Sequence, residues 1–161
     1  MDDMAAWMAK NQPNEHHAHL AKSVGEWKVA GKFWMEPGQP PMETEGTSKI
    51  TAVLGGRYVQ HEYDSSFMGQ PFCGLGLDGY DTVKEAYVST WVDTMSTGIM
   101  SMEGQREGEV TTAFGECPGM GGGTRKVKSV TTSSDAGMVF TMFDEVEGEW
   151  QTSMELTYTR C

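Results

Sequence analysis

The stretch Trp27-Lys28-Val29-Ala30-Gly31-Lys32-Phe33 alternates apolar side chains with charged or small ones. Trp27, Val29 and Phe33 share one face, and the two lysines share the other. A period of two is typical of a β-strand that buries one of its faces. The stretch therefore predicts a strand, and the prolines of Pro37-Gly38-Gln39-Pro40-Pro41 predict a turn that ends it.

Nine further segments show strand patterns between turns, most of them short. The chain holds 12 Val and 16 Thr but only 5 Leu, and β-branched residues favour pleated strands over helices. The ten predicted strands span residues 27–34, 42–54, 57–68, 72–80, 86–93, 99–106, 109–116, 124–133, 138–145 and 149–160. Closure into a barrel removes the exposed edges of so wide a sheet. We expect an all-β, up-and-down antiparallel barrel of about ten strands, with a two-sheet sandwich as the alternative.

A short helix is predicted before the first strand. Asn14 can cap this helix by accepting backbone N–H bonds, and Glu15 suits the positive end of the helix dipole. We expect the helix over about residues 15–23, with its end near Gly25. A chain of 161 residues matches one domain, which we assign to residues 14–161. Residues 1–13 are expected to form an N-terminal extension with a short amphipathic turn at most.

The net charge of −11 disfavours several kinds of partner. Nucleic-acid phosphates and anionic lipid surfaces are bound by clustered lysine and arginine, so we expect neither nucleic acid nor membrane as a partner. No apolar run is long enough for a transmembrane helix, and the acidic start does not resemble a signal peptide. Three cysteines, Cys73, Cys117 and Cys161, cannot all pair with one another, which favours free thiols in the cytoplasm.

The segment Val24-Gly25-Glu26-Trp27 lies between the predicted helix and the first strand. A Gly-x-Trp at that place is similar to the signature of lipocalins, whose barrels also resemble those of fatty-acid-binding proteins. The resemblance implies that Trp27 closes one end of the barrel and that Arg160 packs against it. Two physical arguments also favour a contact between Trp27 and Arg160. The first and last strands of a closed meander are neighbours, and a guanidinium is attracted to an indole face.

A second resemblance covers the chain from about Glu15 to Arg160. Its motifs are Glu15-His16-His17, Val24-Gly25-Glu26-Trp27, Pro40-Pro41-Met42-Glu43, Leu54-Gly55-Gly56-Arg57, Gly76-Leu77-Asp78-Gly79-Tyr80-Asp81, Thr90-Trp91-Val92-Asp93 and Tyr158-Thr159-Arg160. In this order they resemble the bacterial DUF1579 family. The resemblance implies a lipocalin-like barrel and no established chemistry.

Thirteen methionines and five tryptophans predict an adaptable apolar interior. The candidate lining residues are His61, Tyr63, Tyr87, Trp91, Asp93, Met102, Phe140 and Met154. On the tenth strand, one face is expected to hold Trp150, Met154, Leu156 and Tyr158. Two interpretations remain open: the side chains fill the barrel, or they surround a cavity that binds a small, mostly apolar molecule.

Other functions are less well supported by the sequence. His16 and His19 are spaced for a surface metal site, but no Cys pair or His-Glu-x-x-His motif accompanies them. Haem ligation from late in the chain is disfavoured because the last histidine is His61. We therefore expect no metal and no cofactor.

Two alternatives to ligand binding come from different classes of protein. An enzyme would use buried carboxylates such as Asp93, Glu62 or Glu103 as acid–base groups. A structural or homo-oligomeric module would use exposed apolar side chains, for which the candidates are Trp34, Trp7, Met4 and Met8. No nucleophile motif is present, so we favour a binding protein over an enzyme.

Overall fold

A computed structural model describes residues 2–119 and 121–161 and places ten antiparallel strands in a closed barrel. Each strand pairs with its neighbours in the sequence, and the first strand pairs with the last. The strands are β1 (Gly25–Phe33), β2 (Met42–Val53), β3 (Tyr58–Phe67), β4 (Gln70–Asp81), β5 (Ala86–Asp93), β6 (Met100–Glu107), β7 (Val110–Pro118), β8 (Thr124–Ser134), β9 (Gly137–Val146) and β10 (Glu149–Arg160). The predicted all-β up-and-down barrel is therefore confirmed, and the sandwich alternative is wrong.

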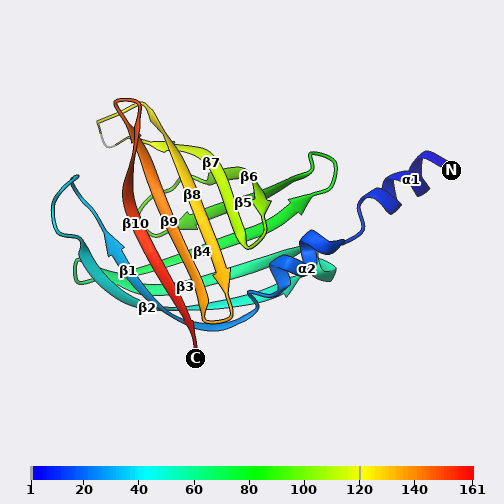
Figure 1. Cartoon of the computed structure of the whole chain (residues 1–161), viewed down its shortest axis with the longest axis horizontal. Coiled ribbons are helices and arrows are strands. Elements are labelled where there is room, and N and C mark those ends of the chain that lie inside the picture. Colours follow the sequence, from blue (N-terminus) through cyan, green and yellow to red (C-terminus); the bar gives the residue numbers. More distant parts are fainter. Residues whose placement is uncertain (1, 120) are drawn as a thin grey trace.

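The seam that closes the barrel runs between β1 and β10. Trp27 lies opposite Arg160 at one end of the seam, and Phe33 lies opposite Met154 at the other. Figure 1 shows β10, in red, crossing the molecule between β1 and β9. Because every strand has two partners, the sheet has no free edge that could pair with another chain.

Helix α2 (Glu15–Ala21) covers one end of the barrel and contacts β3 and β4. Asn14 caps it as predicted, since the Asn14 side chain accepts a bond of 2.9 Å from the His16 backbone. The Asn14 backbone N–H in turn donates to His17 Nδ1 at 3.0 Å. Burial lowers the pKa of His17, which agrees with a neutral ring that accepts this bond.

Residues 2–10 form a second helix, α1 (Asp2–Lys10), where the sequence predicted a short turn at most. None of the α1 residues is buried. Figure 1 shows α1 extending away from the barrel. The acidic pair at its start and Lys10 at its end match the helix dipole, so local propensity rather than packing accounts for α1. Neither α-helix of the described chain is long and apolar enough to cross a membrane.

A cluster of buried apolar side chains lies on β1, β2, β3 and β10, beside α2. It consists of Trp27, Val29, Ile50, Val59, Tyr63 and Leu156. Phe33 packs partly buried against this cluster, as the strand pattern predicted. A barrel of ten strands is too wide for such a core to fill completely, because about eight strands already give an interior that side chains just fill.

One face assignment on β10 is wrong. Trp150 was expected beside Met154, Leu156 and Tyr158, but the pairing register with β9 shifts between Thr152 and Met154. This β-bulge inserts one residue, so positions before it face the opposite side of the sheet. Trp150 accordingly packs outside the barrel against Phe114, with Lys128 above its ring.

A candidate ligand cavity inside the barrel

The barrel encloses a cavity of about 1210 Å³. All eight candidate lining residues lie on its wall: His61, Tyr63, Tyr87, Trp91, Asp93, Met102, Phe140 and Met154. The cavity extends from Ser23 and Arg160 near α2 to Phe67 and Met95 near the opposite end. Of the two open interpretations, a filled interior is therefore wrong.

Strand alternation decides which side chains reach the cavity. On β3, His61 and Tyr63 face inward, whereas Glu62 between them is exposed. On β5, Tyr87, Trp91 and Asp93 line the wall together with Ser89. The alternation along each strand predicted which residues share a face, but it could not identify the interior face, because both faces of each strand mix polar and apolar residues.

Trp91 lies flat against β4 because two glycines make room for it. A Cβ atom on Gly74 would collide with the Trp91 indole, and one on Gly76 would lie 3.0 Å from it. The Trp91 Nε1–H donates to Asp93 Oδ2 at 2.8 Å, and Asp93 Oδ1 accepts from the Met95 backbone at 2.9 Å. Both oxygens of Asp93 thus accept hydrogen bonds, one from the Trp91 indole and one from the backbone that follows β5.

The other two carboxylates of the enzyme alternative lie outside the barrel. Glu62 is exposed on β3, and Glu103 is exposed on β6, where its Oε1 is 3.8 Å from Lys84 Nζ. Neither residue lines the cavity. The prediction that Glu62 or Glu103 could serve as a buried acid–base group is therefore wrong.

An ion pair lies in the cavity wall. His61 Nε2 is 2.8 Å from Asp78 Oδ2, and both side chains line the cavity. Burial acts to lower the pKa of His61, but the charge of Asp78 and the hydrogen bond to it raise that pKa above its ordinary value. His61 is thereby favoured in its charged form, with Asp78 as its counter-ion.

Two residues near this pair were not among the candidates. Asp78 follows the inward positions Gly74 and Gly76 at a spacing of two, and this parity was the signal that could have found it. Tyr158 lines the cavity from β10. Burial, followed by the charges of Tyr63 and Asp78, raises the pKa of Tyr158, so its phenol stays neutral.

The predicted contact between Trp27 and Arg160 is confirmed. Trp27 is only 2% exposed, and the guanidinium carbon of Arg160 lies 4.2 Å from the centre of its ring. Arg160 also donates to the backbone carbonyls of Lys22 at 2.8 Å and Val24 at 3.1 Å. Gly25 has a φ of +145°, and a Cβ atom there would collide with the Arg160 side chain. The Gly-x-Trp spacing thus leaves room for the guanidinium.

The helix histidines make aromatic contacts with the barrel. The His16 ring stacks on Tyr80 with 3.9 Å between ring centres, and His16 Nδ1 is 2.9 Å from Tyr87 Oη. Arg106 Nε donates to the same Tyr87 oxygen at 2.8 Å. Among residues 2–119 and 121–161, no three His, Cys, Asp or Glu side chains are grouped as a metal site requires. These contacts fix α2 against β4 and β5.

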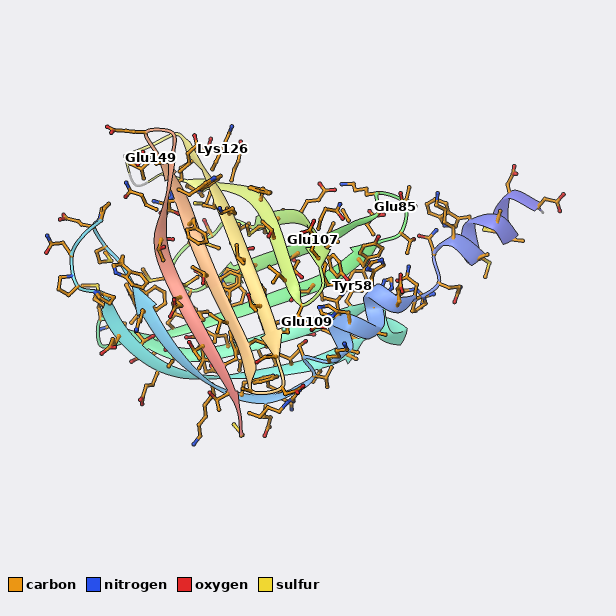
Figure 2. The ribbon with its side chains drawn as sticks, in the orientation of Figure 1. Tyr58, Glu85, Glu107, Glu109, Lys126 and Glu149 are labelled. Atoms are coloured by element: carbon orange, nitrogen blue, oxygen red, sulfur yellow. The ribbon has the colours of Figure 1, made fainter. Side chains whose placement is uncertain are left out.

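Most charged side chains lie on the outside of the barrel, but the cavity wall also carries Asp93, Glu109 and Asp135 besides the pair of His61 and Asp78. Figure 2 shows Glu109 beside α2, where it lies 4.0 Å from Lys22, and shows Lys126 and Glu149 near the opposite end. Lys22 and Arg160 are the lysine and arginine side chains on the cavity wall within the described chain, and both lie at the α2 end. The wall is otherwise mostly apolar.

The three cysteines are unpaired in the part of the chain that the structure describes. Cys73 lies in an apolar run, which made burial the simplest expectation, but it is exposed because β4 turns it outward toward Asp64. Trp7 is exposed as expected for a docking surface, whereas Trp34 is only half-buried rather than exposed.

The fold and the cavity define an antiparallel β-barrel protein with a hollow interior. The chain belongs to the DUF1579 family, a protein family of unknown function, whose model matches residues 12–160. No curated protein matches the chain. Among solved structures, it is similar to the crystal structure of Rv2717c from M. tuberculosis, with a TM-score of 0.62 over 93% of this chain and 99% of that chain. The two sequences are 11% identical, so the likeness concerns the fold alone.

Proposed function

We propose that this protein binds a small, mostly apolar molecule inside its barrel. The observation that carries the proposal is the cavity of about 1210 Å³. Ligand pockets in proteins typically measure about 300–1,000 Å³, so the space suffices for a molecule of drug size.

The composition of the wall supports an apolar ligand. Its apolar surface includes ten phenylalanine, tryptophan and methionine side chains, namely Phe33, Phe67, Phe72, Trp91, Phe140, Met100, Met102, Met138, Met142 and Met154. Methionine is flexible and polarisable, so such a wall adapts to ligands of irregular shape. A net charge of −11 makes anionic ligands the least favoured class.

Titration with Nile red, a neutral fluorescent dye, tests the proposal. We expect saturable binding at one site per chain. Thr131 lines the cavity from β8, so Thr131→Phe fills part of the space and should weaken binding at least about tenfold, the effect of 1.4 kcal/mol.

The matched control uses the next residue on the same strand. Thr132 faces outward and is exposed, so Thr132→Phe should leave the affinity for Nile red unchanged. Circular dichroism of both variants checks that the barrel is intact. Equal affinities in the two variants, or binding that does not saturate, would refute ligand binding in the cavity.

A further inference from the structure

The polar part of the cavity wall has a distinct chemistry. Asp78 Oδ2 is held by His61 at 2.8 Å, and no other described residue pairs with Asp78. The Asp78 side chain is 33% exposed and lines the cavity, so its second carboxylate oxygen is accessible from inside the barrel. This oxygen can accept a hydrogen bond from a ligand.

Tyr158 supplies the complementary group. It lines the same cavity and packs against the buried cluster that contains Tyr63, which lies two residues along β3 from His61, the partner of Asp78. Its ring packs edge-on against Trp27, with 6.2 Å between ring centres, which fixes the position of the phenol. The neutral phenol can donate a hydrogen bond to a ligand oxygen.

The charges on the cavity wall determine whether a carboxylate, an ammonium or a hydroxyl group of a ligand fits there. A carboxylate would lie beside Asp78, to which His61 is already paired; at the α2 end, Lys22 lies 4.0 Å from Glu109 and Arg160 is already bonded to backbone carbonyls. An ammonium group would meet an aspartate that His61 already neutralises. Burial of an uncompensated charge is far more costly than burial of a hydroxyl group.

We propose that the ligand is an apolar alcohol whose hydroxyl group donates to Asp78 and accepts from Tyr158. This inference rests on the proposed function, because it names the class of molecule for the same cavity. A hydroxyl group satisfies both protein groups at once, whereas a ketone would leave the free oxygen of Asp78 without a donor.

Competition against Nile red with four molecules of one shape tests this inference. The molecules are naphthalene, 2-naphthalenemethanol, 2-naphthoate and 2-naphthylmethylammonium. We expect the alcohol to bind roughly tenfold tighter than naphthalene, and both charged molecules to bind more weakly than the alcohol.

Two variants assign the preference to the named residues. Tyr158→Phe should weaken binding of the alcohol roughly 3- to 10-fold and leave the affinity for naphthalene unchanged. Asp78→Leu should also remove the preference for the alcohol. Tyr58→Phe is the matched control, since Tyr58 lies on β3 but does not line the cavity.

The outcomes separate this inference from the proposed function. If naphthalene, 2-naphthoate or the ammonium compound binds as tightly as the alcohol, the inference is wrong while ligand binding stands. An unchanged preference for the alcohol in Tyr158→Phe would also overturn it. If neither Nile red nor any of the four molecules binds, the proposed function itself fails.

Discussion

At the residue scale, Trp27 fills the closed end of the barrel and stabilises it. It is buried, its Nε1–H donates to the Ser23 carbonyl at 2.9 Å, and Arg160 covers its ring. Trp27→Ala should lower the free energy of unfolding by about 3–5 kcal/mol, the usual cost of removing a buried tryptophan. Urea unfolding measures this difference.

Arg160→Ala should cost less, because a cation–π contact contributes about 0.5–2 kcal/mol and Arg160 is itself exposed. A loss for Arg160→Ala as large as that for Trp27→Ala would show that the guanidinium, rather than the buried indole, holds this end. Urea unfolding of both variants in the same buffer compares the two losses in the free energy of unfolding directly.

The pair of His61 and Asp78 gives stability a pH dependence. The raised pKa of His61 means that the folded chain holds this proton more tightly than the unfolded chain. The contribution of this pair to the free energy of unfolding is thus complete below the unfolded pKa of about 6.5. It is lost as the pH rises through the raised pKa of folded His61. At about pH 6, Asp78→Asn should cost about 1.5–3 kcal/mol, as expected for a hydrogen bond to a charged group.

At a pH above the raised pKa of His61 the same substitution should cost less, because His61 is then neutral in both proteins. Urea unfolding of the wild type and of Asp78→Asn at the two pH values checks the direction. A cost that grows with pH would mean that His61 is neutral in the native barrel. Titration of the His61 ring by NMR gives the pKa shift independently.

At the scale of single elements, β4 depends on the glycines that support Trp91. Gly74→Ala would drive a methyl group into the indole, so Trp91 must leave its place against the strand. We expect a loss of about 1–3 kcal/mol in the free energy of unfolding, which is typical of overpacking. Gly98→Ala is the control, because nothing lies within 4 Å of its added methyl group, and it should change stability by less than about 0.5 kcal/mol.

The elements also show what the sequence could and could not predict. Strand alternation and turn residues located all ten strands, because each turn carries glycine, proline or a polar pair that the backbone needs there. The alternation could not reveal the bulge before Met154. Trp150 and Met154 are four residues apart in the sequence, which predicts a shared face, and only the pairing with β9 shows that one residue between them is extra. Asp78 was missed because its role depends on His61 of the neighbouring strand, and pairing register cannot be derived from one strand alone.

At the scale of the whole molecule, α1 stands apart from the barrel. It has no buried residue, and Met4, Trp7 and Met8 are each more than half exposed. Removal of residues 1–12 should therefore change the free energy of unfolding by less than about 0.5 kcal/mol. Thermal unfolding of the shortened chain checks this, and a clear loss would mean that α1 packs on the barrel in solution.

The seam between β1 and β10 also has a consequence for synthesis of the chain. Arg160 bonds to Val24 across a separation of 136 residues, so the barrel closes only after its tenth strand has been synthesised. At about 5–20 residues per second, translation of that interval takes roughly 7–27 s. During this time β1 has only β2 beside it, and its other edge is open to wrong partners. The open edge of β1 is therefore the place where wrong pairing can occur until β10 closes the barrel.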